Sequence, residues 1–204
     1  MANNNDLPKL KHFDGTSFLS QEEIQNMGFA SVGSKVHISR KASFYSPQNI
    51  HIGENVRIDD FCLLSGEITI GSNIHIAAYS CLMGQKGIVL HDFSQISTRV
   101  TILSATDDFS GKYLVGPQVP SGYRNVEGGI VVLERHSLIG AGSIIFPGIT
   151  IMEGSAIGAM SLVVRSTKPW TIYWGIPAKP IKMREKTMVN FETKIVEEEQ
   201  HNDY

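Results

Sequence analysis

Large aliphatic side chains recur at every sixth position over long stretches of this chain. A helix requires apolar residues at spacings of three and four, and a strand with one buried face requires a spacing of two. A strict spacing of six fits a triangular coil, which has three short strands per turn and one large inward side chain per side. Two long blocks carry the pattern, the first at Ile52, Ile58, Leu64, Ile70, Ile76 and Leu82 and the second at Leu133, Ile139, Ile145, Ile151, Ile157 and Val163.

Small residues accompany the aliphatic positions of the second block. A small inward side chain near a corner lets the chain turn, and each strand can then pair its backbone with the coil below. The chain is therefore predicted to be all-β, a left-handed parallel β-helix of hexapeptide repeats. The residues four positions after the anchors are mostly serines: Ser137, Ser143, Ile149, Ser155 and Ser161.

The period is interrupted at three places. The steps from Phe44 to Ile52 and from Leu82 to Leu90 are eight residues long, which we interpret as longer corners. Between residues 104 and 129 the repeat disappears into a segment rich in Gly, Pro, Asp and Tyr. An excursion loop of this length in a compact domain is usually functional.

Both ends of the chain are predicted to carry a short helix. Ser20 and Glu23 have the spacing of a capping box, and Gly28 is a stop signal, so residues 20–27 should form a helix that covers the first coil. Residues 180 to about 199 mix charged and apolar positions and indicate a weak helix. We divide the chain into an N-terminal segment (1–30), the β-helix (31–166) and a C-terminal segment with its tail (167–204).

Composition narrows the function classes. The 204 residues are 42% hydrophobic and 19% charged, with a net charge of -2 and a pI near 6.4. Such a balance gives no bulk attraction to nucleic acid or to an anionic membrane. The first ten residues lack the apolar run of a signal peptide, and Cys62 and Cys81 have no metal-ligand spacing. We expect two reduced thiols in a cytoplasmic protein.

Three stretches of the chain carry a family resemblance. They are ITIGSNIHIAAYSCLMG continued by IVLHDFSQISTRVTILSATDD, then HSLIGAGSIIFPGITIMEGSAIGAMSLVVRS, and the ending WGIPAKPIKMR. Together they resemble the hexapeptide-repeat acyltransferases, in the branch of the galactoside, maltose and surface-polysaccharide sugar acetyltransferases. The resemblance covers residues 30–184 and is most specific at the Gly-x-Pro-Ala-Lys ending. More closely, the chain resembles N-acyltransferases of nucleotide-linked 4-amino-4,6-dideoxy sugars, which act in surface polysaccharide or glycan biosynthesis.

The resemblance implies a homotrimer with active sites between neighbouring subunits and an excursion loop that reaches over the neighbour. It also implies acetyl-CoA or a longer acyl-CoA as co-substrate, and no metal. Ala141 and Ala159 hold equivalent positions where small side chains let pantetheine approach the backbone, although corner packing would also select alanine. The phosphates of coenzyme A need cations. Candidates after the last coils are Arg165, Lys179 and Arg184, with Lys168 and Lys182 nearby, and Pro177 could pack on the adenine.

The sequence departs from the sugar O-acetyltransferases at the general base. In those relatives a histidine on the excursion loop activates a hydroxyl, and counting by coil places Asp107 at that position here. The relatives' cleft asparagine is also missing from the stretch that begins at Ile76. We therefore predict N-acylation of an amino sugar, with O-acetylation of a galactoside or O-antigen hydroxyl as the alternative.

Asp107 and Ser97 are the predicted catalytic residues. A sugar amine needs orientation and a proton acceptor, which a carboxylate supplies, and an outward serine hydroxyl can face the oxyanion. For the acceptor we predict contacts from Asp108, His75, Tyr79 and Tyr123. The competing interpretations are ordinary coil-surface residues for the histidine and serine, and loop packing for the tyrosines.

Two other protein classes share this fold. γ-Type carbonic anhydrases bind zinc through three histidines that include a closely spaced pair. His75, His91 and His136 are instead separated by 16 and 45 residues, which disfavours that class. A purely structural β-helix is disfavoured by the excursion loop, the terminal cations and the Gly-x-Pro-Ala-Lys ending.

Overall fold

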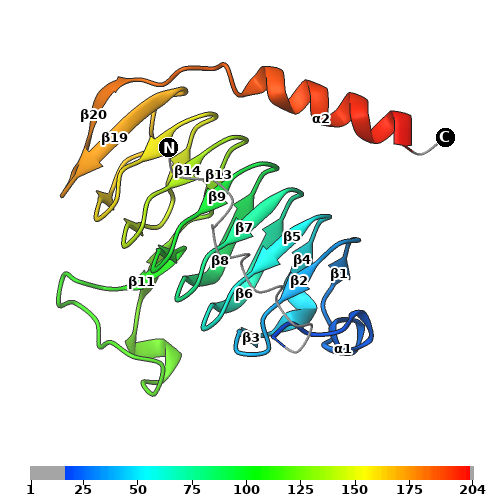
Figure 1. The fold of residues 1–204 in the computed structure, drawn as a ribbon. Coiled ribbons are helices and arrows are strands. Elements are labelled where there is room, and N and C mark those ends of the chain that lie inside the picture. Colours follow the sequence, from blue (N-terminus) through cyan, green and yellow to red (C-terminus); the bar gives the residue numbers. More distant parts are fainter. Residues whose placement is uncertain (1–16, 203–204) are drawn as a thin grey trace, which may run out of the picture.

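A computed structural model describes residues 17–202 and shows a three-sided prism of stacked coils with about seven turns (Figure 1). The strands of each side are parallel and in register from one coil to the next. This is the left-handed parallel β-helix that the six-residue spacing predicts. Helix α1 (Gln21–Asn26) lies at one end of the stack, and β19 (Thr171–Gly175) lies at the other.

Three sides define positions on the prism. Side 1 consists of β2 (His37–Ile38), β5 (Val56–Ile58), β7 (Ile74–Ile76), β9 (Gln95–Ile96), β14 (Leu138–Ile139), β17 (Ala156–Ile157) and β19. Side 2 consists of β3 (Ser43–Tyr45), the first halves of β6 (Leu63–Ile70) and β8 (Cys81–Leu90), β10 (Thr101–Leu103), β15 (Ile144–Ile145) and β18 (Leu162–Val163). Side 3 consists of β1 (Ser31–Val32), β4 (Ile50–Ile52), the second halves of β6 and β8, β13 (Val131–Leu133) and β16 (Thr150–Ile151).

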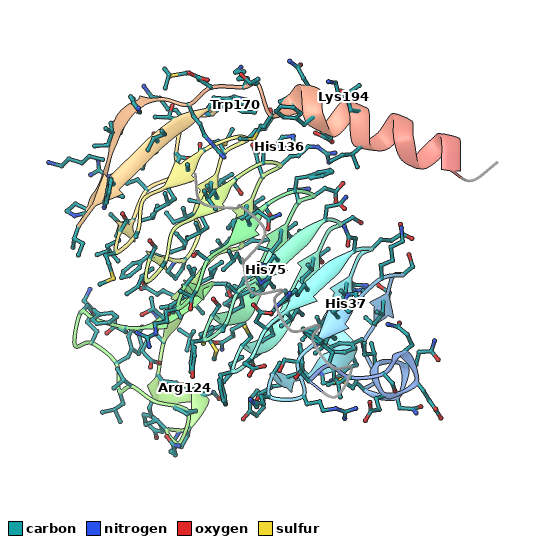
Figure 2. The ribbon with its side chains drawn as sticks, in the orientation of Figure 1. His37, His75, Arg124, His136, Trp170 and Lys194 are labelled. Carbon is teal, nitrogen blue, oxygen red and sulfur yellow. The ribbon has the colours of Figure 1, made fainter. Side chains whose placement is uncertain are left out.

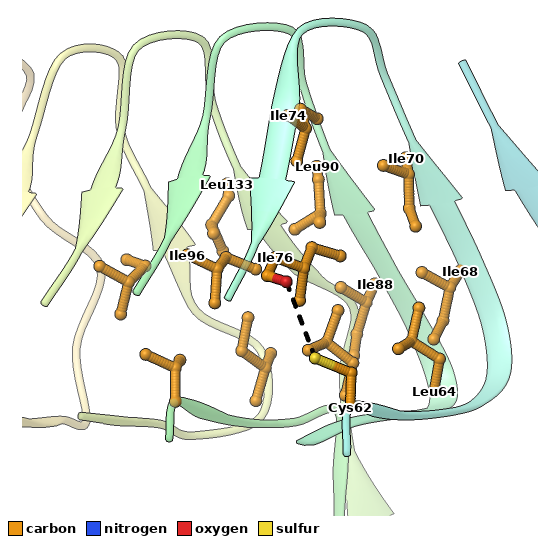
Figure 3. Packing of buried hydrophobic residues seen from close by; sticks show 14 of the residues in the cluster. Cys62, Leu64, Ile68, Ile70, Ile74, Ile76, Ile88, Leu90, Ile96 and Leu133 are labelled. Carbon is orange, nitrogen blue, oxygen red and sulfur yellow. Dashed lines mark hydrogen bonds between the residues drawn. The ribbon is translucent and has the colours of Figure 1, made fainter. Parts of the chain in front are cut away.

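The interior is filled by the aliphatic side chains of the six-residue pattern (Figure 3). Every anchor of the two long blocks is at most 2% exposed. Burial of one such side chain stabilises the fold by about 1.5–3 kcal/mol, so this stack is its main support. The predicted small residues are buried beside the corners, where the hydroxyl of Ser143 donates to the carbonyl of Gly158 at 3.0 Å.

The excursion loop leaves the prism through a hairpin stem that the sequence does not predict. Strand β11 (Ala105–Asp107) pairs antiparallel with β12 (Val126–Gly128), and a short 3-10 turn, Ser121–Tyr123, lies between them. The stem forms because outgoing and returning backbones lie side by side and satisfy each other's hydrogen bonds. The longer corner predicted between Leu82 and Leu90 is a single strand, β8, that continues from side 2 onto side 3. The other, after Phe44, contains the 3-10 turn Pro47–Asn49.

The helix predicted at residues 20–27 is confirmed as α1. Ser20 caps it, with the reciprocal hydrogen bonds of a capping box to Glu23, and Ile24 is buried. The C-terminal prediction is only half right. Residues 178–183 form strand β20 (Ala178–Met183), antiparallel to β19, and helix α2 (Val189–Asn202) begins later. Tertiary pairing with the free edge of β19 overrides the weak helical pattern there.

Among residues 17–202, no helix combines the length and the apolar character that crossing a membrane requires.

Candidate functional site

The corner between sides 1 and 2 stacks small residues directly above one another. In three successive coils these are Ser97, Gly140 and Gly158, and Ala77 precedes them. Each donates its backbone N–H to the carbonyl of the next coil, Ser97 to Ile139 at 2.9 Å. We call this set the Ser97 column.

Ser97 is held by its backbone on both neighbouring coils. Its N–H is bound as above, and its carbonyl accepts from the Ser80 hydroxyl at 3.0 Å. Ile96 before it is buried, so strand alternation turns the Ser97 side chain outward, and the residue is half-buried. A hydroxyl on so fixed a backbone can donate to an anionic oxygen without reorganising.

Ala141 and Ala159 lie one above the other, one position beyond the Ser97 column. The register of β14 with β17 sets this alignment, and the Met160 N–H donates to the Ala141 carbonyl at 2.8 Å. Small side chains therefore line the part of the corner that runs from Ser97 toward the C-terminal end.

Asp107 is the last residue of β11, half-buried, and opposite Val126 in the hairpin stem. Ser97 precedes the corner that leads into β10, whereas Asp107 follows β10 and leaves the prism with the loop. One chain therefore places the two predicted catalytic residues at opposite ends of side 2.

Asp108 holds the start of the loop together. Its carboxylate accepts from the Ser110 hydroxyl at 2.9 Å and from the backbone N–H groups of Ser110 and Lys112, both at 3.2 Å. The hydrogen bond from the Ser110 hydroxyl, above all, lowers the pKa of this carboxyl. Its role toward a substrate stays a prediction.

His75 belongs to a polar cluster on side 1. Its Nε2 lies 2.7 Å from Asp59 Oδ2, and the other oxygen of that carboxylate accepts from Arg57 Nε at 2.7 Å. Asp59, which the sequence analysis missed, fixes the orientation of the imidazole. The only sequence signal for it was its place in the preceding coil, two residues after the position that pairs with His75.

The two predicted tyrosines lie in different parts of the molecule. Tyr79 projects from the corner between sides 1 and 2, where its ring stacks on Phe61 and the Arg99 guanidinium lies 5.7 Å from its centroid. Tyr123 belongs to the excursion loop, and its carbonyl accepts from Leu114.

The predicted donor-binding cations separate into three places. Lys179 is exposed on β20, Arg165 is exposed just beyond β18, and Arg184 lies at the corner between sides 3 and 1. Arg184 Nη1 donates to the carbonyls of His136 and Gly154, at 2.8 and 2.9 Å, and so anchors the C-terminal segment. Its contact with a donor stays a prediction.

The corner between sides 3 and 1 is covered by the chain's own C-terminal segment. His136 is buried there, next to Trp170, and its Nε2 lies 2.7 Å from Glu192 of α2 (Figure 2). Burial lowers the pKa of His136, helped by the charge of Arg135. A neutral ring can still donate its Nε2–H to the Glu192 carboxylate, so the contact agrees with the lowered pKa. Among the side chains of residues 17–195, no three from His, Cys, Asp or Glu converge on a possible metal position.

The chain is similar to known proteins over most of its length. It is 46% identical over 180 residues to the dTDP-4-amino-4,6-dideoxy-D-glucose acyltransferase of Escherichia coli, with 87% of this chain and 94% of that protein covered. A scan against protein-family models finds no match.

Solved structures of similar proteins include one with high sequence identity and one that shares only the fold. AntD, an N-acyltransferase from Bacillus cereus in complex with dTDP and 3-hydroxybutyryl-CoA, is 51% identical, with a TM-score of 0.88 over 90% of this chain and 98% of that one. A hexapeptide-repeat acetyltransferase from Vibrio cholerae is 18% identical with a TM-score of 0.55 over 86% of this chain and 84% of that one, and this likeness concerns the fold alone.

Proposed function

This chain belongs to the family of the dTDP-4-amino-4,6-dideoxy-D-glucose acyltransferase, and on that premise we propose that it transfers an acyl group from coenzyme A to the amino group of a nucleotide-linked deoxyamino sugar. The observation that carries the proposal is the extent of the likeness. It spans nearly the full length of relatives solved with dTDP-4-amino-4,6-dideoxyglucose, coenzyme A and 3-hydroxybutyryl-CoA. The last ligand supports a donor with an acyl chain longer than acetyl.

The acceptor amine explains why an aspartate can replace the histidine of O-acetylating relatives. A sugar ammonium loses its proton near neutral pH, much as an α-amino group does, and the free amine can attack a thioester directly. Asp107 would hold the amine and accept a hydrogen bond from it as the tetrahedral intermediate forms. The nitrogen–carbon bond forms, the carbon–sulfur bond breaks, and the proton from nitrogen ends on the released thiolate.

Ser97 would donate its hydroxyl to the oxyanion of that intermediate. Support comes from the spacing of the two residues. Variants of AntD that change one serine or one aspartate, ten positions apart, have been solved with coenzyme A, and Ser97 and Asp107 are also ten positions apart. Because one chain separates the pair by the whole of side 2, a shared site needs a second chain.

We therefore also propose a homotrimer in which the loop of one subunit meets the Ser97 column of its neighbour. Side 2 supports this because its outward face carries half-exposed apolar side chains, Ile144, Phe146 and Val164 among them.

In the same proposal, Ala141, Ala159, Lys179 and Arg165 contact the donor, and His75, Tyr79 and Tyr123 contact the acceptor. The cytoplasmic location stays a proposal, supported by two free cysteines.

The chemical proposal is tested with matched nucleotide sugars that carry either an amine or a hydroxyl at the same carbon. We expect acylation of the amine, with Asp107→Asn losing most of kcat/KM and Ser97→Ala lowering kcat about 10²–10³-fold. Equal rates on the hydroxyl sugar, or an active Asp107→Asn together with an inactive His75→Gln, would assign the base to a histidine.

The shared site is tested by mixing subunits. Trimers assembled from Ser97→Ala and Asp107→Asn chains contain interfaces with one intact Ser97 and one intact Asp107. We expect activity to return in the mixture but not in either variant alone. An inactive mixture that has demonstrably exchanged subunits contradicts the shared site.

A further inference from the structure

Trp174 lies on the C-terminal end of the Ser97 column. Gly158 donates its N–H to the carbonyl of Tyr173 at 2.8 Å, which sets the last coil directly above it. A side chain on Gly158 would place its Cβ 2.7 Å from Cδ2 and 2.8 Å from Cγ of Trp174. The indole therefore lies flat over the glycine, in a notch that only a residue without Cβ can form.

The other face of this indole is open to solvent. Trp174 is 58% exposed, although its neighbour Tyr173 points inward and is buried. A large ring that rests on a backbone notch and is exposed on its other face offers a surface on which another flat group can stack.

A cation stands next to the ring. Lys179 is the direct antiparallel partner of Trp174 across the β19–β20 hairpin, so both side chains lie on the same face of that ladder. The side chain of Lys179 is exposed. An aromatic face beside an ammonium group matches a purine ring that carries phosphates.

The position along the column fits the same ligand. Trp174 is three coils from Ser97, which at the spacing of paired strands is about 14 Å. Between them lie only Gly140 and Gly158, flanked by Ala141 and Ala159. An extended pantetheine arm with its thioester at Ser97 would therefore run along small residues, and its nucleotide end would reach the indole.

We propose that Trp174, seated on Gly158, is the stacking platform for the adenine of the acyl-CoA donor, and that Lys179 contacts its phosphates. The inference rests on the proposed acyl transfer from coenzyme A and adds the residue that recognises the nucleotide end of the donor.

Intrinsic fluorescence tests this directly because the chain has two tryptophans and only Trp174 is exposed. Titration with coenzyme A should change the tryptophan emission of the wild type, and pantetheine, which lacks the nucleotide, should not. Calorimetry should show coenzyme A binding weakened about five- to hundredfold in Trp174→Leu and much less in Trp174→Phe, which keeps a ring. Pantetheine binding and the KM of the sugar should be unchanged in both variants.

The outcomes separate the two proposals. If the wild type binds coenzyme A but its emission does not change and Trp174→Leu binds equally well, the platform is wrong and the acyl transfer stands. If folded wild type fails to bind coenzyme A at millimolar concentration, both are wrong. Equal loss of pantetheine and coenzyme A binding in Trp174→Phe, with unchanged thermal unfolding, also overturns the platform, because it assigns the residue to the arm of the donor.

Discussion

Two tryptophans sit on glycines at two corners of the last coils, and only one of them is covered. Trp170 lies over Gly154 and Trp174 over Gly158, in each case where a Cβ would strike the ring. Trp170 is 5% exposed, whereas Trp174 is largely exposed.

The difference comes from the path of the chain after β20. The segment turns back over the Trp170 corner, where the Arg184 N–H donates to the Trp170 carbonyl and the Lys186 ammonium lies 5.1 Å from the ring centroid. Helix α2 then leaves along the same edge, held by Glu192 (Figures 1 and 2). The same arrangement, an indole on a glycine, therefore has two uses. At Trp170 the chain covers the ring, which then supports the fold, whereas the ring of Trp174 is uncovered and stays available to a ligand.

Removing each ring should give the largest contrast. We expect Trp170→Ala to lower the free energy of unfolding by about 3–5 kcal/mol, because it empties a buried site. Trp174→Ala should change it by less than about 1 kcal/mol, as at other exposed positions. Urea unfolding of both variants measures the difference, and equal losses would show that both rings are structural.

Filling each notch should give the next contrast. Gly154 has a φ of +65°, and its new Cβ would meet a ring that cannot move, so we expect Gly154→Ala to cost about 2–4 kcal/mol. The ring above Gly158 can swing into solvent. Gly158→Ala should therefore lower the free energy of unfolding by only about 1 kcal/mol, measured by thermal unfolding. It should also raise the KM for acyl-CoA. A stable Gly158→Ala with normal donor KM would break the link between notch and donor.

Removing a contact that holds helix α2 over the Trp170 corner should have a smaller effect on stability. Glu192 contacts both Arg135 and His136, with its side chain 15% exposed. Glu192→Ala should lower the free energy of unfolding by roughly 1.5 kcal/mol and increase hydrogen exchange of the backbone amides in α2. Glu185→Ala removes an exposed carboxylate of the same segment and serves as the control. Unchanged exchange in α2 after Glu192→Ala would show that other contacts hold the helix.

The smallest effect should be a pH dependence confined to the covered corner. Burial keeps the pKa of His136 below the ordinary value of 6.5, so the unfolded chain takes up its proton first as the pH falls. The groups around the ring are Arg135, Arg184, Glu153 and Glu192. Stability contributed by neutral His136 is complete above about pH 6.5 and decreases below it. His136→Asn, which tolerates the left-handed backbone, should show a smaller loss of Tm between pH 7.5 and 5.5. A loss as large as that of the wild type would assign the effect to other groups.

The sequence by itself determined the coil, its core and the helix that covers its first turn. A spacing of six can be read locally because every inward aliphatic residue lies where the period places it, and a capping box closes its hydrogen bonds within four residues. The family could also be predicted from the sequence, because the Gly-x-Pro-Ala-Lys motif follows the last coil directly.

What only the tertiary structure decided concerns contacts between segments far apart in the chain. Strand β20 formed because β19 offered a free edge, and Arg184 became an anchor because the chain turned toward Gly154 and not toward Gly158. The exposure of Trp174 has the same origin. No local pattern distinguishes two tryptophans four residues apart, because what covers each ring depends on where a segment ten to twenty residues later comes to lie.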